Sequence, residues 1–260
     1  MIWQTDGKNW TFDDQPVVMG VLNVTPDSFS DGGTYSSVDL AVDRAMQMVS
    51  EGAVIIDIGG ESTRPNADPV DADEELRRVI PVIKALAARS DVSISIDTRK
   101  VEVARQAVHA GACIVNDVEA NRQDEAMWNL VAQTGVGYVA MHMQGQPGNM
   151  QQNPSYEDVM GDLKSFFHQI MSRMNACGVK KEQVMLEVGI GFGKTLDHNL
   201  VLLRSLDGFK ELGRPLMLGV SRKSMFGKLL DVEQPKDRMP AGLACACWAF
   251  EKGVSVIRTH

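Results

Sequence analysis

Short apolar segments along the chain end in polar or charged side chains, which are the first candidates for chemistry. The segments are rich in β-branched residues and cover residues 17–24, 54–59, 92–97, 113–118, 137–143, 184–189, 215–221 and 254–259. The polar residues at their ends are Asn23, Asp57, Asp97, Asn116, Asp117, His142, Gln144, Glu187, Ser221, Lys223, Arg258 and His260. Amides, carboxylates and cations together suit a pocket for a polar heterocycle and an anion.

Three of these residues are carboxylates within apolar runs: Asp57 in IIDI, Asp97 in SIDT and Glu187 in MLEV. A buried carboxylate is costly unless it is paired or hydrogen-bonded. A bound heterocycle with N–H donors would supply the partners. Taken singly, a strand-end residue such as Asp117 is better explained as a loop or helix cap.

The last segment carries a cation and an imidazole two residues apart. Because side chains alternate along a strand, Val256, Arg258 and His260 share one face. We therefore expect Arg258 and His260 to converge on one anion.

Two loops follow the first two segments and are rich in glycine and hydroxyl side chains. Residues 25–33 read TPDSFSDGG, and residues 59–65 read GGESTRP. Such loops suit a mobile lid over an anion, although two flexible connections are the plainer reading. Residues 189–195 (GIGFGKT) resemble a phosphate-binding loop but lack its spacing, so their glycines indicate a tight turn or close backbone approach to a ligand.

The segments must be strands because most of them are continuous apolar runs, typical of parallel strands buried on both faces. Helical spacing lies between them at residues 38–50, 72–88, 101–110, 124–132, 156–176 and 241–251. Glycines at 52, 111, 178 and 253 suit left-handed helix caps. Alternating strands and helices predict an α/β protein with a (βα)8 TIM barrel, with a doubly wound sheet as the alternative.

We expect a single domain over residues 1–260. Residues 1–15 contain two aromatic segments around Asp6-Gly7, which predict an N-terminal β-hairpin closing one barrel mouth. After the last predicted strand the chain stops at His260, so the final helix of the barrel is expected to be absent from this chain.

Composition excludes several classes of protein. The 260 residues are 44% hydrophobic and carry a formal charge of -8 without a basic run, which argues against nucleic acid and anionic membranes as partners. The four cysteines lack metal-ligand spacing, and no signal peptide or membrane-spanning run is present, so we expect a cytoplasmic protein.

Two long segments, MGVLNVTPDSFSDGG (19–33) and IDIGGESTRP (56–65), resemble the signatures of the dihydropteroate synthase family. The resemblance continues in order through SIDT (95–98), VND (115–117), MHMQG (141–145), GFGK (191–194), SRKS (221–224) and RTH (258–260). It therefore covers nearly the whole chain.

The resemblance implies a folate-pathway transferase that joins 6-hydroxymethyl-7,8-dihydropterin pyrophosphate to p-aminobenzoate. It implies Mg²⁺ held by Asn23, a homodimer, and sulfonamides as competing inhibitors. It assigns the pterin ring to Asp97, Asn116 and Glu187, with Lys223 lying against the ring, and it counts Asp57 among the substrate-binding residues. It assigns the pyrophosphate to Arg258 and His260, and the catalytic roles to Asp97, Lys223, Arg258 and His260. It assigns the arylamine to residues of three loops: Thr63, Arg64, Pro65, Phe192 and Ser224. It also places Asp27, Asp31 and Arg64 in mobile loops.

The chain departs from the family at Glu187-Val188, where members typically have Asp-Pro. This departure motivates one alternative, a pterin-binding paralogue that does not release pyrophosphate. A second alternative is a pterin-dependent methyltransferase, which shares the barrel and the pterin pocket but should lack the TRP and SRKS segments present here.

Overall fold

The computed structural model describes residues 1–12, 15–25, 34–62, 68–120, 122 and 124–260. Eight parallel strands close into a barrel in the order β10-β3-β4-β5-β6-β7-β8-β9. The strands are β3 (Val17–Asn23), β4 (Ile55–Gly59), β5 (Ser93–Asp97), β6 (Ile114–Asp117), β7 (Gly137–Met141), β8 (Val184–Glu187), β9 (Leu216–Gly219) and β10 (Val256–Thr259). The predicted TIM barrel is confirmed, and each strand lies within its predicted segment.

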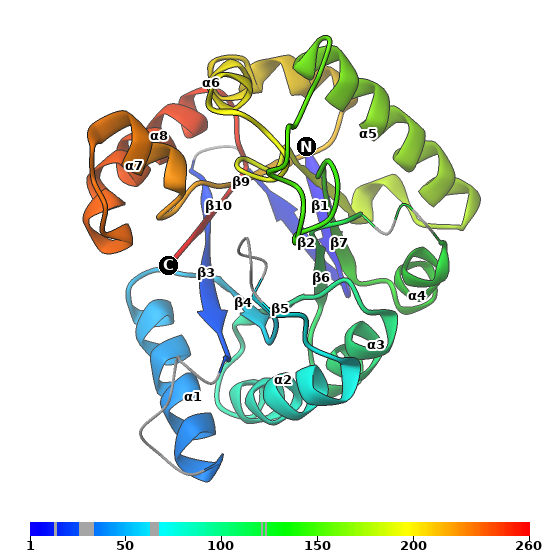
Figure 1. Cartoon of the computed structure of the whole chain (residues 1–260). Helices are drawn as coiled ribbons and strands as arrows, with labels where there is room; N and C mark the ends of the chain where they lie inside the picture. The colour runs from blue at the N-terminus through cyan, green and yellow to red at the C-terminus, as the bar shows by residue number, and fades with distance from the viewer. Residues whose placement is uncertain (13–14, 26–33, 63–67, 121, 123) are drawn as a thin grey trace.

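Helices surround the barrel as an outer ring (Figure 1). They are α1 (Thr34–Ser50), α2 (Ala72–Ala87), α3 (Val101–Ala110), α4 (Ala126–Thr134), α5 (Val159–Ala176), α6 (Leu196–Arg204), α7 (Ser224–Leu230) and α8 (Met239–Glu251). Short 3-10 helices lie at η2 (Lys181–Gln183), η3 (Leu206–Leu212) and η4 (Pro235–Arg238). The helical spacing did not predict α6 and α7, which are short.

The predicted glycine caps adopt the left-handed backbone. Gly111 ends α3 with φ 119°, and Gly52, Gly178 and Gly253 have φ of 110°, 89° and 87°. A residue with a Cβ is strained at such angles, so each glycine lets the chain leave a helix and turn into the next strand.

Two apolar layers hold the barrel together. The larger lies between the strands and the helix ring, and includes Trp128, Phe167 and Phe209, all of which are buried. The smaller fills the N-terminal half of the barrel interior with side chains from seven strands: Met19, Ile55, Ile114, Val139, Met185, Met217 and Val256. The barrel is therefore a packed core whose opposite end is left for polar groups.

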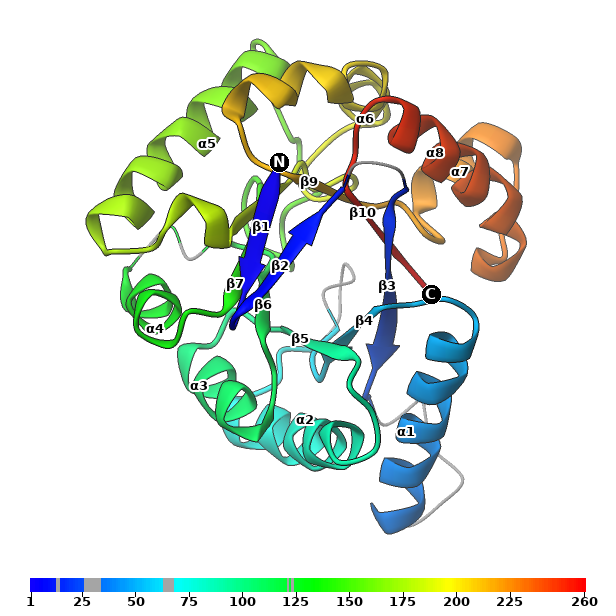
Figure 2. The same cartoon turned by 180° about the vertical axis from the view of Figure 1, so that it is seen from behind.

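An antiparallel hairpin of β1 (Ile2–Thr5) and β2 (Lys8–Thr11) closes the N-terminal mouth, as predicted. Figure 2 shows it in dark blue across the barrel, inside the helix ring. Trp3 pairs with Trp10 across the hairpin, and Trp3 Nε1 donates a 2.9 Å hydrogen bond to the carbonyl of Gln183. At Gly137 a Cβ would lie 2.5 Å from Thr5 Cγ2, so this glycine allows the hairpin to seat.

None of the described helices is long and apolar enough to span a bilayer.

Candidate active site

The polar strand ends meet at the C-terminal mouth of the barrel, opposite the hairpin. Parallel register places Gly59 beside Asp97, Asp97 beside Asn116, and Arg258 beside Gly219. Because all eight strands run in the same direction, their terminal side chains gather at one rim.

Arg258 joins two carboxylates at the centre of this rim. Its Nε donates to Asp57 Oδ2 at 2.6 Å, and its Nη2 donates to Asp97 Oδ2 at 2.6 Å. Asn116 Nδ2 donates to the same Asp57 oxygen at 2.9 Å. The sequence predicted that Arg258 would face an anion, and the anions it meets here are protein carboxylates. The pairing offsets the desolvation of Asp57, which is completely buried.

Several acceptors at this rim lack partners. Among the described residues, Asp57 Oδ1, Asn116 Oδ1 and Ser95 Oγ are buried without a hydrogen-bond partner. Ser95 is aligned with Asp57 on the neighbouring strand. Buried polar atoms are nearly always hydrogen-bonded, so these oxygens are suited to donors from a ligand. Ser95 was not among the predicted site residues.

The pocket shifts the pKa of the groups around Arg258. Burial raises the pKa of Asp97 to about 7, with Arg258 lowering it and Asp57 and Glu187 raising it. Burial also raises the pKa of Glu187, against Arg258 and Lys223. Burial lowers the pKa of Lys223 to about 8, although Glu187 favours its charged form. Such perturbed groups are typical of functional sites.

The sequence departure at Glu187-Val188 is accommodated by packing. The glutamate is 5% exposed, and a Cβ on Gly219 would lie 3.0 Å from its Oε1. The valine is fully buried in the main core. The turn that follows depends on Gly189, which has φ 66° and would place a Cβ 2.1 Å from the carbonyl oxygen of His142. The turn is thus held without proline.

Phe192 and Lys223 form one wall of the rim. The Lys223 Nζ lies 4.0 Å from the Phe192 ring centroid, a cation–π contact. Ser224 is exposed at the start of α7. The glycines of residues 189–193 all have positive φ; Gly189 and Gly193 pack against the loop after β7 and Gly191 lies beside Lys223, so they form a tight turn.

His260 is oriented by a residue that the sequence prediction left without a role. Its Nδ1 lies 3.0 Å from Ser221 Oγ, and its backbone N–H donates to the same oxygen at 3.3 Å. This contact leaves Nε2 as the nitrogen that can face a ligand. Ser221 was a strand-end residue within the SRKS segment, but neither signal showed that it would contact His260.

Asn23 is half-buried at the end of β3. The described residues contain no cluster of three or more histidine, cysteine, aspartate or glutamate side chains that could hold a metal. A single amide oxygen together with phosphate oxygens is nevertheless a donor set that suits Mg²⁺, which is often held by few protein ligands. The residues present therefore fit Mg²⁺ only in company with a phosphorylated substrate.

Other predicted residues separate from this site or cannot be placed. Asp117 accepts hydrogen bonds from the Tyr138 hydroxyl at 2.8 Å and from the Glu119 backbone at 2.9 Å, so it has the local structural role that the plainer reading gave it. Five predicted residues lie outside the described ranges: Asp27, Asp31, Thr63, Arg64 and Pro65.

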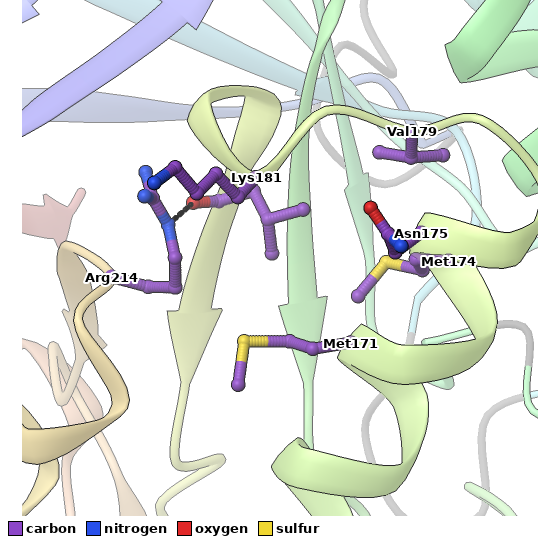
Figure 3. A pocket seen from close by; sticks show the side chains of 7 residues that line it. Met171, Met174, Asn175, Val179, Lys181 and Arg214 are labelled. Atoms are coloured by element: carbon purple, nitrogen blue, oxygen red, sulfur yellow. Dashed lines mark hydrogen bonds between the residues drawn. The ribbon is translucent and has the colours of Figure 1, made fainter.

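A separate cleft lies among α5, η2, β8 and the segment before β9 (Figure 3). Arg214 in this cleft donates to the carbonyls of Val184 at 3.2 Å and Ile2 at 2.9 Å. These contacts fasten the hairpin to the barrel.

Comparison with known proteins places this geometry in context. The family model for pterin binding enzymes matches residues 19–260. The dihydropteroate synthase of Escherichia coli K12 is 48% identical over 245 residues, covering 94% of this chain and 86% of that protein. The one from Synechocystis is 46% identical over 243 residues, covering 94% and 84%.

Solved structures agree. The Yersinia pestis dihydropteroate synthase in complex with a sulfonamide drug superimposes with a TM-score of 0.92 at 46% identity, covering 100% of this chain and 94% of that one. The Xanthomonas albilineans enzyme in complex with 7,8-dihydropteroate gives 0.88 at 40% identity, covering 99% and 92%.

Proposed function

The chain belongs to the dihydropteroate synthase family, and from this premise we propose how its residues carry out the reaction. The amine nitrogen of p-aminobenzoate attacks the methylene carbon of 6-hydroxymethyl-7,8-dihydropterin pyrophosphate. A C–N bond forms, the C–O bond to pyrophosphate breaks, and the amine loses a proton. The products are 7,8-dihydropteroate and pyrophosphate.

The observation that carries this proposal is the group of orphaned acceptors at the rim. Asp57 Oδ1, Asn116 Oδ1 and Ser95 Oγ are buried and unpartnered among the described residues. A pterin ring presents N–H donors along one edge, and Asp97 and Glu187 supply further carboxylate acceptors. Donors that match these acceptors recover the desolvation cost that the protein's described contacts leave uncompensated.

An arylamine is already a nucleophile, so the protein has mainly to stabilise developing charge. The carboxylates of Asp97 and Glu187 favour positive charge that develops on the pterin methylene. Lys223, Arg258 and His260 favour the departing negative charge. Arg258 is positioned for both tasks because its guanidinium already spans Asp57 and Asp97. Phe192 and Ser224 line the arylamine side of the pocket.

We assign Mg²⁺ to Asn23 together with the pyrophosphate of the substrate. When bound, this ion supplies Lewis-acid stabilisation of the leaving group. The support is the chemistry of the donor set, a hard amide oxygen at the rim.

Pyrophosphate release tests the proposal. The full chain is incubated with both substrates, with and without Mg²⁺, and pyrophosphate and dihydropteroate are quantified together. We expect both products in equal amounts and a requirement for Mg²⁺. Pterin binding without release would favour the non-catalytic paralogue, and methyl transfer from methyltetrahydrofolate would favour the methyltransferase.

We also infer a homodimer. Exposed apolar side chains occur on α7 and α8: Leu229, Leu230, Met239, Leu243 and Trp248. Contiguous exposed apolar surface is typical of an interface. Sedimentation should give twice the chain mass, and Leu243→Asp should shift the species toward monomer. A cytoplasmic location remains part of the proposal, supported by four free cysteines.

A further inference from the structure

Lys194 is a buried cation without a described carboxylate partner. Its side chain belongs to a residue that is only 2% exposed. Its Nζ lies 3.0 Å from His142 Nδ1 and donates to two backbone carbonyl oxygens, that of His142 at 3.2 Å and that of Phe192 at 3.0 Å. Burying a lysine is costly, so its retention here needs an explanation.

The three contacts match the hydrogen-bonding capacity of the amine in either protonation state. An ammonium donates to both carbonyls and to the His142 Nδ1 lone pair. A neutral amine donates to both carbonyls and accepts from Nδ1–H. Burial lowers the pKa of His142 to about 2, with Lys194 and Arg122 also lowering it, so the imidazole stays neutral. The pair thus remains satisfied without a counter-ion.

These bonds connect the loops after β7 and β8 at a point with little space. The backbone N–H of His142 donates to the Glu187 carbonyl at 3.0 Å. A Cβ at Gly189 or Gly193 would lie 2.1 Å or 2.4 Å from a backbone oxygen of the neighbouring loop. The two loops therefore approach as closely as their backbones permit, and the Nζ of Lys194 joins them by its contacts with His142 and Phe192.

Phe192 connects Lys194 to the active site because it contacts both Lys194 and Lys223. Its carbonyl accepts from Lys194, and its ring lies beneath the Nζ of Lys223 at 4.0 Å. Tyr156 adds a second anchor, because its hydroxyl donates to the Gly193 carbonyl at 2.7 Å. A shift of the Phe192 backbone would move the ring that forms the arylamine wall.

We propose that Lys194 is a positioning residue for the arylamine substrate: by joining the loops after β7 and β8, it sets the place of the Phe192 ring against Lys223. The inference rests on the proposed function, which puts p-aminobenzoate beside Phe192. A lysine with a purely structural role would alter the stability of the barrel and would leave the two substrates equally affected.

Steady-state kinetics of Lys194→Met test the proposal. Methionine keeps the length and volume of the stem but removes every donor. We expect KM for p-aminobenzoate to rise on the order of tenfold, with kcat and the pterin dissociation constant changed less than about threefold. Lys181→Met, an exposed lysine 79% accessible at its side chain, is the matched control and should behave like the unaltered protein.

Phe192→Ala distinguishes failure of the proposed role of Phe192 from failure of the inference about Lys194. If this variant leaves KM for p-aminobenzoate unchanged, the assignment of Phe192 in the proposed function has failed. If Phe192→Ala raises KM and Lys194→Met does not, the assignment stands and the inference about Lys194 is overturned. Equal losses for both substrates in Lys194→Met would also overturn it.

A second variant and a spectroscopic measurement cover the case in which Lys194→Met does not fold. Lys194→Gln, which is shorter and neutral, should show the same selective rise in KM. In the unaltered chain, ¹⁵N NMR should show the His142 ring neutral throughout the stable acidic range. An imidazole that titrates near its ordinary pKa of about 6.5 would contradict the Lys194–His142 contact.

Discussion

The two mouths of the barrel differ in how completely their buried polar groups are hydrogen-bonded. At the N-terminal mouth, Trp3 is fully buried and its indole N–H is paired with the Gln183 carbonyl. At the C-terminal mouth, Asp57 is also fully buried, but its Oδ1 and the side-chain oxygen of Asn116 lack hydrogen-bond partners within the described residues. One end is closed and satisfied, and the other retains unmet hydrogen-bonding capacity.

This contrast indicates which end of the barrel contributes mainly to folding stability and which is suited to ligand binding. Apolar packing and complete hydrogen bonding at the hairpin stabilise the fold. At the C-terminal rim, some buried acceptors have no donor from the described part of the protein, so a ligand that supplies the donors can form those hydrogen bonds. Substitutions at the two mouths should therefore separate stability from catalysis.

The largest expected effect is on stability, at the closed mouth. Trp3→Ala removes a fully buried ring and its hydrogen bond, and should lower the free energy of unfolding by about 3–5 kcal/mol. Denaturant unfolding measures the loss. At a temperature where the variant stays folded, kcat should equal that of the unaltered protein. A large fall in kcat would show that the two mouths are not independent.

Next comes Arg258→Met at the open mouth. The change removes a cation from the leaving-group side and leaves Asp57 and Asp97 without their shared partner. We expect kcat/KM to fall about 10²- to 10³-fold, as for loss of one transition-state donor. Single-turnover kinetics measure the chemical step. Arg89→Met, at an exposed surface ion pair, is the control and should leave the rate unchanged.

A smaller effect is expected from Asp97→Asn. The amide offers one acceptor where the carboxylate offers two, so pterin affinity should fall by about 1–3 kcal/mol in calorimetry. Unchanged affinity would argue against the pterin assignment.

The pH dependence of the same residue follows from its pKa of about 7. The carboxylate form that accepts from the pterin is reached only as the pH rises through that value, so affinity should increase there in the unaltered protein and not in Asp97→Asn. The raised pKa also means that the contribution of Asp97 to the free energy of unfolding is full below about pH 4 and falls as the pH rises through about 7.

Glu187→Asp should have the smallest effect, with turnover preserved within about threefold or improved. Aspartate restores the side chain typical of the family, and the turn after it is fixed by Gly189 and the His142 carbonyl. Steady-state rates at saturating substrate check this. An inactive but folded variant would mean that the pocket is built around the longer side chain near Gly219.

Much of the fold followed from the sequence because burial on both faces leaves continuous apolar runs. All eight barrel strands were predicted in this way, and the hairpin was predicted from the aromatic segments around the Asp6-Gly7 turn. Helices α6 and α7 were not predicted; α7 has only 7 residues, which offer too few turns for a periodic pattern.

The site was predicted less completely. Strand-end position identified Asp57, Asp97 and Asn116 but could not show that Arg258 bridges two carboxylates, because pairing depends on barrel closure. Lys194 stood in a motif with no assigned role, since its partners are backbone carbonyls that any sequence possesses.

The hairpin also has a consequence for the order of events during synthesis. Ile2 leaves the ribosome well before its hydrogen-bond donor Arg214, which lies 212 positions later, and Trp3 well before its acceptor Gln183, 180 positions later. Contacts of such long sequence separation form late. Trp3 thus lacks its hydrogen-bond partner until Gln183 has been synthesised, and in this interval the exposed hairpin is a target for a chaperone.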